Sequence, residues 1–272
     1  MNAAIDYEAE YNNRARVPEY PTHFAAWTRD AAAYREKHAP RSIIYGPGAR
    51  NQIDFFPGGG DGAIVVFIHG GYWQAFDGSF FSHLAAGLNA HGVSVAIPSY
   101  GLCPDVTVDQ IIGQMRAASR ELAKQRRPLV IAGHSAGGHL AACMLATDWP
   151  AFDASLPADL VTAAYSISGL FDLGPLVKTS VNNALHLDEV TARAASPLFW
   201  KVPAHGSLDA VVGGHESAEY FRQSRTIVDV WGATSLPTRF GTVANANHFT
   251  AIAPLADPDS PMVLRLKELA GR

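Results

Sequence analysis

The residues Gly133-His134-Ser135-Ala136-Gly137 have the types and spacing that suit nucleophilic chemistry. They follow the apolar run 128–132, which is typical of a buried strand, and precede the run 139–146, which is compatible with a helix. Flanking glycines allow a turn too tight for a Cβ, and a strand–turn–helix of this kind exposes the serine hydroxyl. We therefore predict Ser135 as a nucleophile and the N–H of Ala136 as an oxyanion donor. The alternative is an ordinary glycine-rich turn.

A second glycine motif could supply further donors to the same oxyanion. His69-Gly70-Gly71-Tyr72-Trp73 ends the continuous apolar run 63–68, which is expected to be a buried strand. Successive glycines at a strand end can turn their N–H groups toward a ligand. We predict that Gly70 and Gly71 complete an oxyanion hole with Ala136, although a plain Gly-Gly turn would have the same sequence.

The base that activates the serine is predicted to be His248. It follows the last expected strand, 238–243, and the polar loop 244–247, and Phe249 is expected to begin the next helical segment. In an open parallel sheet, chemistry gathers beyond the carboxyl ends of the strands. His205 precedes its strand and so lies at the opposite end, while His134 and His139 are too close in sequence to Ser135 to reach its hydroxyl. A purely structural histidine is the alternative for His248.

The acid that orients this base is predicted to be Glu216, in the loop after the expected strand 208–212. Asp209 belongs to the start of that strand, and Glu219 is expected to face solvent on the following helix. A glutamate is suitable chemistry because the acid fixes the imidazole tautomer and stabilises the imidazolium. A surface glutamate is the alternative.

The elements that must position these residues alternate between strands and helices, which predicts a mostly parallel sheet of about eight strands with helices on both faces. We expect a single α/β domain over residues 1–272, opening with a helical segment at 1–38. The segment 170–200 has no clear strand and is expected to form a small lid or entrance wall. The expected strands are 42–45, 52–56, 63–68, 93–97, 129–132, 163–168, 208–212 and 238–243, and the clearest expected helices are 80–90 and 108–125.

The amino-acid composition limits which binding partners, location and cofactors we expect for the protein. A net charge of −4 without a long basic run argues against nucleic acid, and no apolar stretch reaches the roughly 18–20 residues that span a bilayer. The first eight residues lack a basic and apolar leader, and two cysteines, Cys103 and Cys143, make no disulfide framework, so we expect a cytoplasmic protein. No Cys or His pair has zinc-ligand spacing, so we expect no metal and no organic cofactor. A homo-oligomer remains open.

The HGGYW sequence at 69–73 resembles the HGGxW motif of arylformamidases (kynurenine formamidases) and their bacterial esterase relatives in the α/β-hydrolase superfamily. The resemblance implies an α/β-hydrolase fold that cleaves an N-formyl or ester bond with a Ser–acid–His triad and donors from the HGG loop. The order Ser135, Glu216, His248 along the chain is the order in this superfamily. Two positions depart from the family, since Glu216 replaces the usual Asp and Gly101 replaces a polar residue. Other similar stretches are 11–14, 100–104, 133–141 and 216–220.

The substrate is expected to be a small molecule, aromatic if the aromatic side chains near the predicted strand ends line the pocket. A general short-chain carboxylesterase would share every catalytic residue, and a non-catalytic ligand-binding protein on the same scaffold is the alternative of another class. Arg14 and Arg193 are candidates for binding a substrate carboxylate. The predicted substrate-binding residues are Tyr72, Trp73, Tyr100, Phe171 and Phe249.

Overall fold

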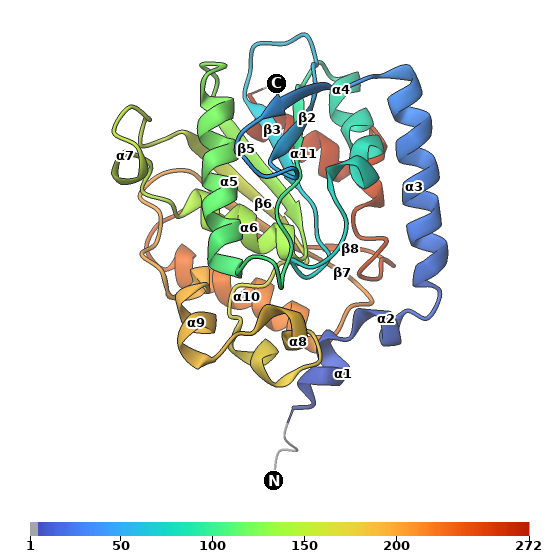
Figure 1. The fold of residues 1–272 in the computed structure, drawn as a ribbon, viewed down its shortest axis with the longest axis vertical. Helices are drawn as coiled ribbons and strands as arrows, with labels where there is room; N and C mark the ends of the chain where they lie inside the picture. The colour runs from blue at the N-terminus through green and yellow to red at the C-terminus, as the bar shows by residue number, and fades with distance from the viewer. Residues whose placement is uncertain (1–4, 272) are drawn as a thin grey trace.

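A twisted eight-stranded sheet forms the centre of the molecule, with helices packed on both of its faces (Figure 1). The strand order is β1-β2-β4-β3-β5-β6-β7-β8. The β1–β2 and β2–β4 pairs are antiparallel, and all other pairs are parallel. The predicted fold class is confirmed. The strands are β1 (Arg41–Ile44), β2 (Gln52–Phe56), β3 (Ile64–Ile68), β4 (Val95–Pro98), β5 (Leu129–His134), β6 (Val161–Ile167), β7 (Leu208–Gly213) and β8 (Thr238–Val243).

The computed structural model describes residues 5–271. Residues 1–4 and 272, which the predicted 1–38 segment and 1–272 domain include, lie outside the described residues. Within the described chain, no helix combines the length and hydropathy that a bilayer crossing requires. The helices are α1 (Tyr7–Tyr11), α2 (Asn13–Arg16), α3 (Tyr20–Lys37), η1 (Gly78–Ala85), α4 (Ala86–Ala90), α5 (Val108–Ala123), α6 (Ala136–Leu145), α7 (Trp149–Phe152), η2 (Gly174–Lys178), α8 (Asn182–Leu185), α9 (Glu189–Ala194), η3 (Pro197–Phe199), α10 (Ala218–Gly232), η4 (Ala253–Ala256) and α11 (Pro261–Leu269).

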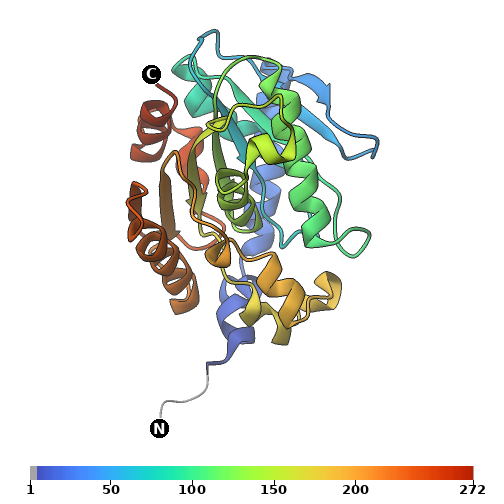
Figure 2. The same cartoon turned by 90° about the vertical axis from the view of Figure 1, so that its left-hand side faces the viewer.

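The central strands are apolar on both faces because helices cover both. Every residue of β3 is buried, and its side chains alternate between two separate cores. Ile64, Val66 and Ile68 join the core beneath α5, α6 and α10. Val65 and Phe67 join the core beneath α3, η1, α4 and α11. In Figure 1 the sheet lies between these two layers, with α5 to its left and α3 to its right, and Figure 2 looks onto the sheet from the side that α5 covers.

Two expected elements differ from the structure. The region 80–90 is a 3₁₀ helix, η1, followed by the short α-helix α4, and not one amphipathic helix. Phe249, which was expected to begin a helix, lies in a turn after β8, and the next helical element is η4. The segment 170–200 contains only short helices, η2, α8, α9 and η3, and it lies with α1 at one end of the molecule in both views (Figures 1 and 2).

Candidate active site

Ser135 occupies a strained turn between β5 and α6. Its backbone has φ +55° and ψ −116°, a conformation that a side-chain-bearing residue rarely adopts. The glycines permit this turn, because a Cβ on Gly137 would lie 1.9 Å from the carbonyl oxygen of Ile68. The hydroxyl is thereby held at the tip of the turn, at the carboxyl end of β5, as the motif predicts.

Three side chains far apart in the sequence meet at this turn. The Nε2 atom of His248 lies 3.1 Å from Oγ of Ser135, and its Nδ1 lies 2.7 Å from Oε2 of Glu216. His248 is 5% exposed and the Glu216 side chain 1% exposed. A carboxylate only accepts, so Nδ1–H donates to Glu216 and Nε2 is left to accept the Ser135 proton. The structure therefore brings together the three residues that the sequence predicted.

The second oxygen of Glu216 is also bound. Oε1 accepts hydrogen bonds from Oγ of Ser168, at 2.5 Å, and from the N–H of Gly213, at 2.7 Å. With both oxygens engaged, the carboxylate has one orientation toward the imidazole. Asp209, the rejected alternative, is instead ion-paired with Arg265 at 2.8 Å.

His134 has a function that the sequence reasoning missed. Its Nε2–H donates to the carbonyl oxygen of His248 at 2.8 Å, which fixes the backbone of the loop that carries the imidazole. Burial is the main cause that lowers the pKa of His134 well below its ordinary value, so the ring is neutral. The second residue of the pentapeptide thus ties the turn of Ser135 to the loop of His248.

The HGG loop runs alongside Ser135. A Cβ on Gly70 would lie 3.1 Å from Cβ of Ser135, and both Gly70 and Gly71 line the cavity over the serine. The loop is held from below because the His69 ring stacks on Tyr100, with centroids 4.2 Å apart, while the Tyr100 hydroxyl donates to the His69 carbonyl at 2.9 Å. Ala136 is the first residue of α6, where an N–H has no acceptor within the helix. Gly70, Gly71 and Ala136 therefore all lie close to Ser135.

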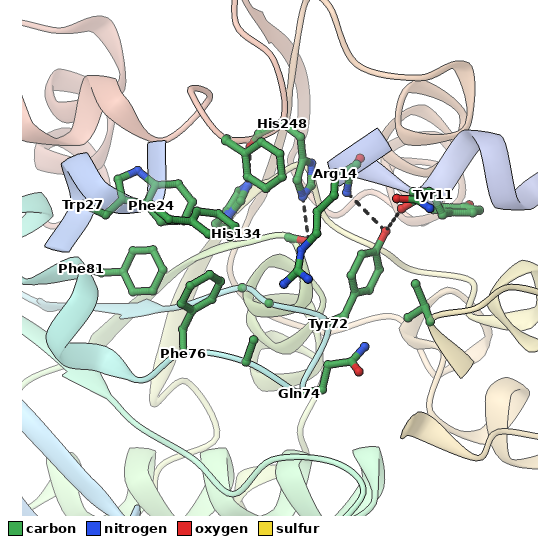
Figure 3. A pocket seen from close by; sticks show the side chains of 18 of the residues that line it. Tyr11, Arg14, Phe24, Trp27, Tyr72, Gln74, Phe76, Phe81, His134 and His248 are labelled. Carbon is green, nitrogen blue, oxygen red and sulfur yellow. Dashed lines mark hydrogen bonds between the residues drawn. The ribbon is translucent and has the colours of Figure 1, made fainter. Parts of the chain in front are cut away.

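A cavity of about 500 Å³ opens over Ser135 and His248 (Figure 3). Of the five predicted substrate-binding residues, Tyr72 and Phe249 line it. Trp73, Tyr100 and Phe171 do not, which corrects the prediction; each is fully buried in the core beneath α5, α6 and α10. The aromatic wall of the cavity is formed by Phe24, Trp27, Phe76, Phe81 and Phe249. Of these, Phe24, Trp27 and Phe81 were not predicted from the sequence.

The N-terminal segment covers one side of this cavity. The Tyr72 hydroxyl donates to the Tyr11 carbonyl at 2.6 Å and lies 2.8 Å from the Tyr220 hydroxyl. The Tyr11 hydroxyl donates to Glu219 at 2.8 Å. Glu219 was predicted to face solvent, and this was wrong. It is 3% exposed because α1 folds back over α10 and buries it against Tyr11 and Arg222.

The 170–200 segment lies beside α1 and adds Ser180 and Val181 to the lining, with Ser180 hydrogen-bonded to Glu8. Arg14 also lines the cavity, whereas Arg193 lies over the ring of Phe199, 4.1 Å from its centroid, and is not part of the lining. Among the residues that the structure describes, no three His, Cys, Asp or Glu side chains are grouped so as to hold a metal ion.

The chain matches known proteins over most of its length. The alpha/beta hydrolase family matches residues 65–269. The kynurenine formamidase of Danio rerio is 30% identical over 241 residues, which cover 85% of this chain and 81% of that protein. A protein of Silicibacter sp. TM1040, provisionally assigned as a thioesterase, has a crystal structure that is 35% identical with a TM-score of 0.84, covering 96% of this chain and 98% of that one.

An esterase of Pyrobaculum calidifontis shares the fold with a TM-score of 0.71 over 92% of this chain and 93% of its own, at 16% identity. At that identity the likeness concerns the fold alone. The family match and the identity to a kynurenine formamidase both extend over most of the sequence. The chain therefore belongs to the alpha/beta hydrolase family and is related to the kynurenine formamidases.

Proposed function

We propose that this chain is a serine hydrolase that cleaves an N-formyl or N-acyl arylamide, or a small carboxylic ester, through a Ser135–Glu216–His248 triad. The observation that carries the proposal is the pair of hydrogen bonds on His248, one to Ser135 and one to Glu216. This arrangement joins nucleophile, base and orienting acid in the order that acyl transfer requires.

The reaction proceeds in two halves. Oγ of Ser135 attacks the carbonyl carbon while Nε2 of His248 takes its proton, and the backbone N–H groups of Gly70 or Gly71 and of Ala136 bind the developing oxyanion. His248 then gives the proton to the leaving amine or alkoxide as the C–N or C–O bond breaks. Water, deprotonated by His248, attacks the acyl-enzyme and releases the carboxylic acid and free Ser135.

The cavity supports an aromatic leaving group. Its volume of about 500 Å³ is that of a small-molecule site, and one wall is aromatic. Phe24, Trp27, Phe76 and Phe249 lie in that wall and are in ring-to-ring contact with one another. A flat aryl group would stack there while a small acyl group occupies the space beside Ser135. The relationship to a kynurenine formamidase gives independent support for an arylamide substrate.

Both Cys103 and Cys143 are free and buried, which fits our further proposal that the protein acts in a reducing cytoplasm.

A kinetic panel tests the proposal against its nearest rival, a general short-chain carboxylesterase. We expect measurable kcat/KM on formanilide and N-formylkynurenine, and lower kcat/KM on p-nitrophenyl esters as the acyl chain lengthens. Good turnover of butyrate or longer esters with none of formanilides would favour the carboxylesterase. The Ser135→Ala variant should retain only the residual rate that the oxyanion donors and binding supply, about 10³–10⁴ over water. If it hydrolyses any of these substrates at the wild-type rate, the proposal is wrong.

A further inference from the structure

Arg14 is the one strongly basic side chain among the described residues that line the cavity. It belongs to the short helix α2, and Figure 3 shows its side chain extending into the cavity between Phe76 and Tyr72. Its guanidinium carbon lies 5.4 Å from the Tyr20 ring centroid and 5.9 Å from that of Phe24. Arg14 therefore forms part of the same wall as the aromatic residues.

The charge of Arg14 has no counter-ion in the described structure. No Asp or Glu lines the cavity, and no described carboxylate lies within ion-pair distance of Arg14. The Glu8 carboxylate, which is near the rim residue Ser180, accepts hydrogen bonds from Ser180 and Asn12. Arg14 consequently presents to the cavity a positive charge that no carboxylate of the lining pairs, and such a charge attracts an anionic ligand.

The backbone that carries Arg14 is fixed. The neighbouring residue, Asn13, is 6% exposed and donates to the Tyr220 hydroxyl at 2.8 Å and to the Tyr72 hydroxyl at 3.3 Å. Tyr72 directly follows Gly71 of the HGG loop. The hydrogen bond from Asn13 to Tyr72 thus ties the backbone beside Arg14 to the loop that borders Ser135, and the bond to Tyr220 ties it to α10. A ligand on Arg14 and an acyl group on Ser135 would therefore share one cavity.

We propose that Arg14 binds a carboxylate on the substrate, so that the site prefers acyl arylamides or aryl esters that carry an anionic group. A guanidinium presents a planar fork that matches a carboxylate with two parallel hydrogen bonds. The adjacent aromatic rings would hold the aryl group that carries the carboxylate. This inference rests on the proposed function of Ser135, and it adds a specificity determinant that the nucleophile and base do not provide.

The test compares each formamidobenzoate isomer with neutral formanilide. Wild type, Arg14→Gln, Arg14→Lys and Arg16→Gln are assayed on the 2-, 3- and 4-isomers. Arg16 is the matched control because, like Arg14, it is an exposed arginine on the same helix, but it does not line the cavity. Comparing ratios of kcat/KM, charged over neutral, between variants cancels the intrinsic reactivity of each substrate.

We expect Arg14→Gln to lower the charged-to-neutral ratio roughly tenfold or more for at least one isomer, the loss expected for a hydrogen-bonded charge, chiefly through KM. Arg14→Lys should retain part of the preference, because it keeps the charge and loses the fork. Arg16→Gln should leave the ratio unchanged. A ratio that falls equally in Arg14→Gln and Arg16→Gln, or in neither, overturns the inference while leaving the hydrolase proposal intact.

If no substrate is hydrolysed, a direct binding measurement still tests the carboxylate site at Arg14 separately from the hydrolase proposal. In that case the proposed function fails, and calorimetric titration with benzoate and benzamide still tests Arg14. Wild type should bind benzoate more tightly than benzamide, and Arg14→Gln should abolish the difference. Equal binding of both ligands by wild type contradicts the proposed carboxylate site.

Discussion

Oγ of Ser168 donates a 2.5 Å hydrogen bond to Oε1 of Glu216, on the side of the carboxylate that faces away from His248. Ser168 directly follows β6 and has a φ of +53°. The acid therefore receives support from β6 as well as from its own loop after β7, through Gly213. Ser168 follows β6, Glu216 follows β7 and His248 follows β8. Two consecutive hydrogen bonds therefore link residues at the ends of three neighbouring strands.

Replacing Ser168 should impair the chemical step. We expect Ser168→Ala to lower kcat roughly tenfold with little change in KM, because the carboxylate loses a charge-assisted hydrogen bond that fixes its orientation. Ser166→Ala is the matched control, since its buried hydroxyl on β6 has no hydrogen-bond partner among the described residues. Steady-state kinetics measure kcat and KM for both variants. Equal kcat values for Ser168→Ala and Ser166→Ala would show that Ser168 does not support the chemical step through Glu216.

Replacing Glu216, the acid of the triad, should lower kcat more than replacing Ser168 does. In Glu216→Gln the side chain can no longer stabilise the imidazolium or fix its tautomer, and we expect kcat to fall by about 10³–10⁴. Glu216→Asp keeps the carboxylate but draws it back by one methylene from His248, so its kcat should lie between those of wild type and Glu216→Gln. A Glu216→Gln enzyme with near-wild-type kcat and an unchanged melting temperature would show that another group orients His248.

The position of the N-terminal segment, residues 7–16, over the cavity should depend on Asn13. The Asn13→Ala variant leaves the hydroxyls of Tyr72 and Tyr220 without their amide donor, which costs about 1–3 kcal/mol locally. We expect a raised KM and faster amide hydrogen exchange in residues 7–16, with Arg16→Gln as the control. Unchanged exchange in that segment would mean that other contacts hold it over the cavity.

Buried histidines, among them His69 and His139, should make the free energy of unfolding depend on pH. Burial lowers the pKa of His69 and of His139 to about 4, below the value of about 6.5 in an unfolded chain. Between these values the unfolded state binds protons that the folded state does not, so the free energy of unfolding falls as the pH falls from about 6.5 toward 4. Each histidine contributes a slope of about 1.4 kcal/mol per pH unit.

Urea unfolding at pH 7, 6 and 5 measures that slope. His139→Gln should reduce it by about one proton, because the amide can still donate to the Ala195 carbonyl that His139 Nε2 contacts at 2.7 Å but does not titrate. A slope that is the same in wild type and His139→Gln would show that His139 does not titrate differently in the two states.

The strands and the nucleophile turn were predictable because their signals are local. Fully apolar runs such as those that became β3 and β5 arise only where a strand is covered on both faces. The turn glycines reflect approaches within one motif, such as that of Gly137 to Ile68. Glu216 and His248 could then be chosen because both follow strands that end at the same edge of the sheet.

Two kinds of feature could not be predicted from the sequence. These are the direction in which a side chain points and the burial of a residue by a segment far away in the sequence. Tyr100 follows a strand end, yet its ring packs beneath His69 because its hydroxyl binds the His69 carbonyl. Glu219 is buried by α1, more than 200 residues away in sequence. The region 80–90 has helical apolar spacing, which does not distinguish a 3₁₀ helix from an α-helix, and the structure forms η1 followed by the short helix α4 there.

Covalent labelling of Ser135 tests the central claim most directly. A fluorophosphonate probe, located by peptide mass spectrometry, reports whether this oxygen is the activated nucleophile beside His248. We predict one phosphonyl group per chain, attached to Ser135, with loss of hydrolysis in proportion to labelling and much slower labelling of His248→Ala. Full hydrolytic activity in a chain labelled at Ser135, or a label at another residue that alone abolishes activity, would contradict the account.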